Sequence, residues 1–202
     1  MKIIFVCFLF LFFLPLSGCS KDLAGNQKNP WHHWEGKFRN PPNSISREVS
    51  VFDRLKFFSS LLLSQNGSLE LGALEEHVLG SEEALSQLAE SAESNSITWI
   101  GHSTFLVRLN GLTILTDPIF SDRASPLSFA GPKRRALLNI NIKNLPLIDV
   151  VIVSHAHYGH LDTKTLDALP GKESITAVVP LGLGKLFRGR GFIDVREADW
   201  YD

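Results

Sequence analysis

The stretch VVIVSHAHYGHLD, Val150–Asp162, places three histidines within six positions, directly after a run of apolar residues. Such a run indicates a buried strand, so His155 and His157 come at its end and His160 at the approach to a helix. Two rings at the end of an extended strand can turn toward one point in the following loop. Neutral imidazole is the commonest nitrogen ligand of zinc and similar ions. The spacing therefore predicts a metal site formed by His155, His157 and His160.

Two more polar side chains stand next to predicted strands, His102 in the segment GHST and Asp117 in the segment TDP. Alone, each would be read as a cap or turn residue. Metal-bound histidine usually donates its second N–H to a carboxylate or a carbonyl, so beside a histidine site both become supporting groups. Asp162 could fill the same role, but its position favours capping the helix that follows.

The pattern along the chain alternates strands with helices and indicates an α/β layered fold. Asn110-Gly111 predicts a two-residue hairpin, Ser81 is expected to cap a helix, and residues 121–146 are expected to form a long loop. The predicted strands are Ile97–Ile100, Thr104–Leu109, Leu112–Thr116, Asp149–Ser154, Ile175–Val179 and Ile193–Glu197, and the predicted helices are Val49–Ser64, Ser81–Ser94, Thr163–Leu169 and Leu183–Arg190.

The N-terminus has the pattern of an export signal. Ile3–Leu14 is an unbroken apolar run of twelve residues, shorter than the roughly 20 that a membrane span needs. The following LSGC resembles a bacterial lipobox, which implies cleavage before Cys19 and lipidation of that cysteine. Ser20 resembles the signal for sorting to the outer membrane, so we expect a membrane-anchored lipoprotein facing the periplasm. A secreted protein without lipid and a retained N-terminal anchor are the alternatives.

We therefore expect a signal peptide over 1–18, a tether and docking segment over 19–48, and a hydrolase domain over 49–202. The chain of 202 residues is 44% hydrophobic and 20% charged, as in ordinary globular proteins. A formal net charge of −1 gives no reason to expect a nucleic-acid partner. The basic cluster Lys133, Arg134 and Arg135 is either a solvated loop or a contact for lipid phosphate.

Four separated segments, in order, carry a resemblance to the metallo-β-lactamase superfamily, and within it to the group of N-acylphosphatidylethanolamine-hydrolysing phospholipases D. They are WIGHSTFLVRLNGLTILTDPIFSDRASPLSFAGPKR (Trp99–Arg134), LPLIDVVIVSHAHYGHLD (Leu145–Asp162), VPLGLG (Val179–Gly184) and EADWYD (Glu197–Asp202). The resemblance implies a four-layer αβ/βα sandwich with two zinc ions that hydrolyses membrane phospholipid. Its H-x-H-x-D-H motif would place His155 and His157 on one ion and His160 on the other.

The chain departs from the family pattern in two ways. Gly159 stands where the motif has an aspartate, so one expected carboxylate ligand is missing. The chain also ends before the later family ligands, so we expect the truncated first half of the sandwich, with a separate complementing C-terminal half as a conceivable partner. Alternatives to a phospholipase are a catalytically inactive lipoprotein or interaction remnant and another hydrolase of the superfamily, such as a lactonase.

Overall fold

The computed structural model of the protein describes residues 30–41, 43–44, 49–63, 77–125, 131, 133–134, 138–200 and 202. Cys19, Arg135 and the expected signal peptide lie outside these residues. The chain divides into two compact units, Met1–Glu48 and Val49–Asp202, and each unit is described by itself.

The first unit contains a small antiparallel hairpin of β1 (His33–Trp34) and β2 (Lys37–Phe38). Its turn residues Glu35 and Gly36 both have positive φ, 49° and 73°. The guanidinium of Arg39 lies 4.9 Å from the ring centroid of Trp34, a cation–π contact that holds the second strand against the first.

The second unit begins with helices α1 (Val51–Leu63) and α3 (Ser81–Glu90), both within the predicted ranges. Ser81 does not cap α3, because the N-cap position falls on Gly80, which offers no side-chain acceptor. Glu82 and Glu83 lie in the first turn, where carboxylates favour the positive end of the helix dipole. Among the described residues, no helix combines the length and apolar character needed to cross a bilayer.

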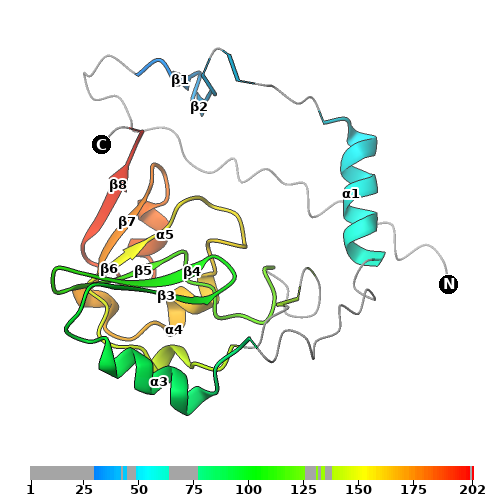
Figure 1. Cartoon of the computed structure of the whole chain (residues 1–202). Helices are drawn as coiled ribbons and strands as arrows, with labels where there is room; N and C mark the ends of the chain where they lie inside the picture. The colour runs from blue at the N-terminus through cyan, green and yellow to red at the C-terminus, as the bar shows by residue number, and fades with distance from the viewer. Residues whose placement is uncertain are drawn as a thin grey trace. The chain divides into compact units, whose positions relative to one another are not determined.

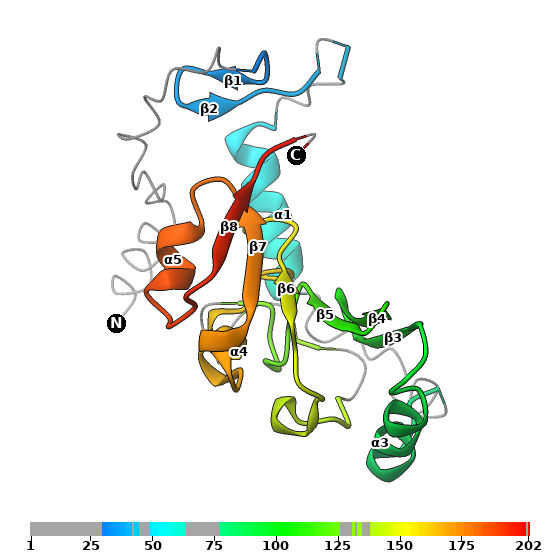
Figure 2. The same cartoon turned by 90° about the vertical axis from the view of Figure 1, so that its left-hand side faces the viewer.

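A six-stranded sheet forms the centre of this unit, and its strands follow one another in chain order (Figures 1 and 2). The first three strands are antiparallel, and the last three continue parallel to the third. The strands are β3 (Ser96–Gly101), β4 (Thr104–Leu109), β5 (Leu112–Thr116), β6 (Val150–Ile152), β7 (Thr176–Pro180) and β8 (Val195–Ala198). The predicted α/β fold is confirmed, and β4 and β5 have the predicted bounds.

The predicted hairpin between β4 and β5 is confirmed. Asn110 and Gly111 have φ angles of 51° and 82°, the left-handed pair that a two-residue turn matched to strand twist requires. Leu109 then pairs with Leu112, and this register carries through to Phe105 and Thr116.

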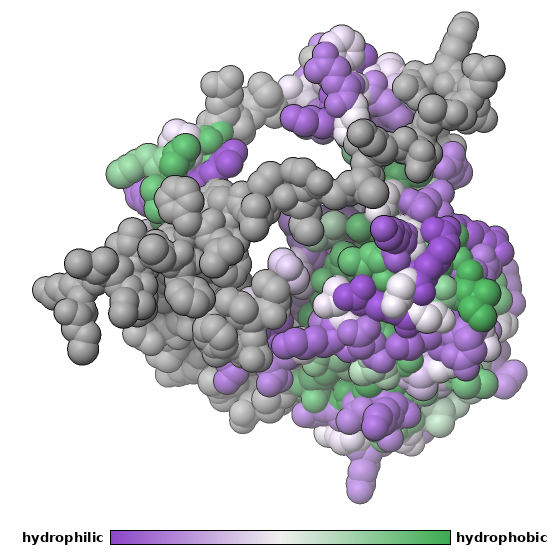
Figure 3. All heavy atoms as spheres, turned by 180° about the vertical axis from the view of Figure 1, so that it is seen from behind, coloured by the Kyte–Doolittle hydropathy of each residue, from purple (hydrophilic) through white to green (hydrophobic). Residues whose placement is uncertain are grey.

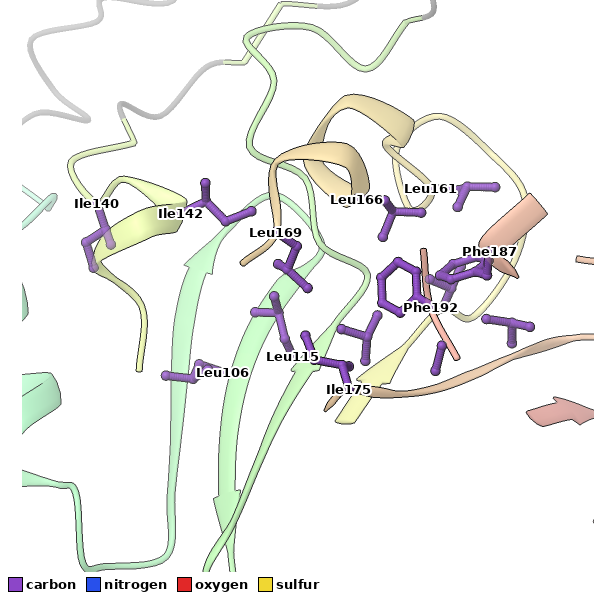
Figure 4. Close-up of a cluster of buried hydrophobic side chains, with 14 of the residues drawn as sticks. Leu106, Leu115, Ile140, Ile142, Leu161, Leu166, Leu169, Ile175, Phe187 and Phe192 are labelled. Carbon is purple, nitrogen blue, oxygen red and sulfur yellow. The ribbon is translucent and has the colours of Figure 1, made fainter. Parts of the chain in front are cut away.

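The hydrophobic core lies on one face of the sheet, under α3, α4 (Thr163–Ala168) and α5 (Gly184–Arg188) (Figure 1). Leu106, Leu115 and Val151 point into this face from three neighbouring strands and are at most 1% exposed. Figure 4 shows Leu166 of α4 beside Phe187 and Phe192, whose ring centroids lie 5.2 Å apart. Two short 3-10 turns, η3 (Ile142–Asn144) and η4 (Lys172–Ser174), complete the layer.

Arg108 is a buried cation that attaches α3 to the sheet. Its side chain extends from β4 and donates hydrogen bonds to the carbonyl of Leu88 and, at 2.9 Å, to Oγ of Ser91. These acceptors lie at the C-terminus of α3, where the helix dipole favours positive charge. The strand pattern alone gave no sign that this arginine would face inward.

The opposite face of the sheet is apolar and exposed in the described part of the chain. Ile97 and Trp99 of β3 are 74% and 59% exposed, and Phe105, which pairs with Trp99, is 38% exposed. Figure 3 shows apolar residues reaching the surface among polar ones on one face of the molecule. Within the described residues, the sheet therefore has one packed face and one exposed apolar face, called here the bare face.

Candidate metal centre

The sequence-predicted site residues gather at the edge of the sheet where β5 and β6 end. These strands are parallel, so their carboxyl ends lie at one edge. Asp117 directly follows β5, and its backbone N–H donates to the carbonyl of Ile152 at 2.8 Å. His155 follows β6 by three residues, which places it beside Asp117.

Asp117 is the centre of the hydrogen-bond network at this edge. Its Oδ1 accepts from the backbone N–H of Ser154, and its Oδ2 accepts from the Ser154 hydroxyl, both at 2.7 Å. The same Oδ2 lies 2.8 Å from Nδ1 of His160. Asp117 is buried, so these bonds replace the water that its carboxylate would otherwise hold.

The three histidine rings of the motif lie close together. The ring centroid of His155 lies 4.0 Å from that of His160 and 4.7 Å from that of His157. Nδ1 of His155 lies 3.0 Å from the Ser154 hydroxyl, which already donates its proton to Asp117. The serine oxygen therefore accepts from the Nδ1–H of His155, so Asp117 orients His160 directly and His155 through Ser154.

His102 lies against Gly159. A Cβ atom built on Gly159 would stand 2.9 Å from Nε2 of His102, closer than side-chain contacts allow. The hydroxyl of Ser103 donates to the carbonyl of Gly159 and joins the two loops. The imidazole of His102 thus occupies the space where a side chain at position 159 would begin.

Two of these residues have unusual backbone conformations. His102 has a φ of 54° and Asp117 a φ of 40°, in the left-handed region that residues other than glycine seldom adopt. Such strain costs on the order of 1–3 kcal/mol for each residue and tends to occur at functional sites. The surrounding bonds hold both residues in these positions.

The surroundings of His155 and His102 favour the neutral form of each ring. Desolvation lowers the pKa of His155, and the neighbouring His160 and His157 lower it further, while the carboxylate of Asp117 opposes the change. Desolvation also lowers the pKa of His102, with further lowering from Arg134 and His160. Neutral imidazole is the form that binds a metal.

Residues 96–192 match the sequence model of the family described as the Beta-lactamase superfamily domain. The chain carries a β-lactamase superfamily domain. Every sequence-predicted site residue except Cys19 falls within the matched range. The predicted superfamily is confirmed, and with it the general class of a metallo-β-lactamase-type hydrolase domain.

Several known proteins are similar to part of this domain. An uncharacterised protein of Mycobacterium tuberculosis is 42% identical over 107 residues, which cover 52% of this chain and 29% of that protein. N-acyl-phosphatidylethanolamine-hydrolyzing phospholipase D 1 of Caenorhabditis elegans is 44% identical over 95 residues, which cover 46% of this chain and 27% of that enzyme. These matches span less than a third of either relative's length.

Among solved structures, a possible metal-dependent hydrolase from Veillonella parvula aligns with 52% of this chain and 42% of its own. The two are 25% identical, with a TM-score of 0.41.

The donors of this β-lactamase superfamily domain fit a divalent ion held by imidazole nitrogen. In His155 and His160 the Nδ1 atom is engaged by Ser154 and Asp117, which leaves Nε2 to act as the ligand. In the described part of the chain, the three motif histidines do not bring three ligand atoms within 4.8 Å of one another. Their rings would therefore turn toward an ion, and the exposure of His157 allows this. Gly159 has no side chain, so position 159 offers no side-chain ligand to an ion.

Arg134 extends from the long loop of the domain toward Gly101 and His102. Its Nη1 lies 3.0 Å from where a Cβ on Gly101 would stand, and Gly101 has a φ of 135°, so this approach requires glycine. Arg134 also donates to the carbonyl of Ile119, and its buried Nε has no hydrogen-bond partner among the described residues. With Lys133 and Lys164 it lines a cavity of about 690 Å³ beside α4.

Two serines of the site were missed at the level of sequence. Ser154 connects Asp117 to His155, and Ser103 joins the loop of His102 to that of Gly159. The sequence offered one signal that could have identified them: each serine stands directly next to a candidate histidine at the end of a strand. Asp162 caps α4 as predicted, accepting from the backbone N–H groups of Lys164 and Thr165.

Proposed function

We propose that this protein is a zinc-dependent phosphodiesterase of the phospholipase D type, acting on N-acylphosphatidylethanolamine or a related membrane phospholipid. The observation that carries the proposal is the contact between Asp117 and His160, at 2.8 Å, within a group of three histidine rings. A carboxylate that orients a histidine in this way is typical of metal sites. The similarity to a nematode enzyme that is named for this substrate supports the choice of phospholipid.

Each side chain has a distinct part in the proposal. His155, His157 and His160 provide imidazole nitrogens, while Asp117 and Ser154 keep two of the rings in one orientation. A bound zinc ion would lower the pKa of water to about 7 and offset negative charge on the phosphoryl oxygens.

Arg134 is the proposed contact for the substrate phosphate. Its Nε has no hydrogen-bond partner within the described part of the chain, its loop lies beside His102, and a guanidinium matches the geometry of phosphate oxygens. Lys133 and Lys164 add positive charge to the neighbouring cavity. An anionic headgroup would give the buried donor of Arg134 the acceptor that the described residues do not supply.

The proposed location is a membrane surface, where this substrate is found. Lipid on Cys19 would hold the chain there, and two or more acyl chains make such anchoring stable. The LSGC segment supports a bacterial lipoprotein, and Ser20 supports an outer-membrane protein that faces the periplasm.

The test measures zinc content and hydrolysis of vesicles that contain N-acylphosphatidylethanolamine, using the full chain. We expect zinc to bind, and His155→Ala to reduce its affinity by at least about 10-fold. Arg134→Gln should raise KM with zinc content unchanged, because it removes a substrate contact and no ligand. Hydrolysis at the same rate with and without a chelator would contradict a metal-dependent reaction.

Gly159 favours a second candidate, a lipid-anchored module without catalytic activity. The missing carboxylate removes a group that, in the resembling family, would hold the second ion. A chain that binds zinc at His155 but hydrolyses neither phospholipids nor lactones would support this candidate. Hydrolysis of either substrate by the unaltered chain would exclude it.

A further inference from the structure

The inference concerns the space beside Gly159 and rests on the metal site proposed above. A side chain at position 159 would first meet the imidazole of His102, whose Nε2 lies 2.9 Å from the Cβ position. We infer that His102 is a nitrogen ligand that takes the coordination position a carboxylate at residue 159 would fill. The site would then hold its ion with imidazoles alone.

The backbone around His102 is held in place on both sides. The indole N–H of Trp99 donates to the carbonyl of His102 at 3.0 Å, and the Ser103 hydroxyl donates to the carbonyl of Gly159. His102 also keeps a left-handed φ of 54°. A strained residue that the surrounding bonds hold in place is a common feature of functional sites.

The ring of His102, unlike those of His155 and His160, makes no hydrogen bond to the described residues. Both of its nitrogens therefore remain available, and the exposed side chain is free to turn toward an ion. Its pKa is lowered by desolvation, then by Arg134 and His160, which is consistent with a neutral ring.

A site built from imidazoles has a different metal preference from one with a carboxylate. Nitrogen donors suit zinc, cobalt, nickel and copper, whereas magnesium, calcium and manganese prefer oxygen. Replacing a carboxylate by a neutral ring also leaves the site more positive by one charge. The altered metal preference and the added positive charge both result from having glycine at 159 and an imidazole from His102 in its place.

The experiment titrates the full chain with Co²⁺, following the visible absorption of the bound ion and the heat of binding. His102→Asn is the informative variant, because asparagine tolerates the left-handed backbone but offers no imidazole. We expect it to weaken Co²⁺ binding by at least about 10-fold and to change the absorption spectrum. His77→Asn is the matched control, since His77 is an exposed histidine remote in sequence from the motif, and we expect it to bind like the unaltered chain.

A second variant separates loss of a ligand from loss of folding. Gly159→Asp in the His102→Asn background puts a carboxylate into the vacated space, and we expect it to restore at least part of the affinity. Unchanged Co²⁺ affinity and spectrum in His102→Asn, while His155→Ala loses binding, would overturn this inference and leave the proposed site standing. Equal binding by His155→Ala and the unaltered chain would overturn the proposed site and this inference together.

Discussion

Asp117 shows how one side chain organises the site. Its two oxygens accept from the Ser154 amide and hydroxyl, and one of them also contacts His160. Because the carboxylate is buried, each partner fixes it more firmly than the same bond would in water. The orientation of His155 and His160 therefore depends on a residue that the proposal does not use as a ligand.

Asp117→Asn tests this dependence. Asparagine tolerates the φ of 40° that Asp117 adopts, so the backbone can stay in place. The amide cannot match all three donors, and we expect metal affinity to fall by about 10–100-fold. Isothermal titration of the full chain with Zn²⁺ measures this effect, and an unchanged affinity would show that Asp117 does not orient the ligands.

Ser154→Ala removes the link between Asp117 and His155. We expect a smaller loss of zinc affinity than for Asp117→Asn, because His160 keeps its direct contact with the carboxylate. Ser154→Thr retains the hydroxyl and serves as the matched control, with an affinity close to that of the unaltered chain. A loss in Ser154→Thr as large as in Ser154→Ala would point to packing instead of the hydroxyl.

Helix α4 is the element that joins the site to the core. Leu166 of this helix is fully buried, and Asp162 at the N-terminus also accepts from the backbone N–H of Ser121 at 3.0 Å. Thr165 accepts from the backbone N–H of Phe120 at 2.8 Å. The loop that follows Asp117 is thus fastened to the same helix that the histidine segment enters.

The pH dependence of stability should report on Asp162. Burial works to raise the pKa of this carboxyl, but hydrogen bonds from Thr165 and Ser121 lower it overall below the ordinary 3.8. The unfolded chain therefore binds the proton more readily. The stabilisation is present above the ordinary pKa and is lost as the pH falls through the lower pKa of the folded state.

Asp162→Asn checks this sign. Asparagine is an equally good cap through its carbonyl oxygen. Its amide nitrogen, however, accepts no hydrogen bond, so the two bonds that Oδ2 of Asp162 takes from Ser121 and Thr165 are lost, at a cost on the order of 1–3 kcal/mol. We expect urea unfolding to show this difference near neutral pH and a smaller one as the pH falls through the lowered pKa of Asp162 in the folded state. If the difference in unfolding free energy between the wild type and Asp162→Asn stays constant with pH, the pKa of Asp162 is not lowered in the folded state.

The whole unit has two unlike sheet faces. Alternate residues of β4 point to opposite sides, so Leu106 is 1% exposed while its neighbour Phe105 is 38% exposed. On β3, Ile97 is 74% exposed on the bare side. The described side chains that stabilise the sheet by packing therefore lie on the face that α3, α4 and α5 cover.

Paired substitutions on the two faces test this difference. Leu106→Ala should lower the free energy of unfolding by about 2–5 kcal/mol, because it leaves a cavity in the core. Ile97→Thr should change it by less than about 0.5 kcal/mol, since its side chain is mostly in solvent and threonine suits a strand. Chemical unfolding of the full chain measures both, and a large loss in Ile97→Thr would show that the bare face is covered in solution.

Much of the fold could be predicted, because alternation and turn chemistry are local. The hairpin at Asn110-Gly111 and the cap at Asp162 were predicted from two or three residues each, and both are confirmed. The inward position of Arg108 could not be predicted, because its carbonyl partner Leu88 lies 20 positions away. The link through Ser154 was missed for the same reason, since it involves Asp117, 37 positions earlier.

By itself, the sequence determined the α/β order of elements, the superfamily and the three histidines that end a buried strand. Hydrophobic period and short motifs are properties of neighbouring residues, so they can be read without the fold. Only the tertiary structure decided which residue orients which ring and what lies beside Gly159. Those contacts join Asp117, His102 and the histidine loop across separate strands, and their distances exist only once the parallel strand ends meet at one edge.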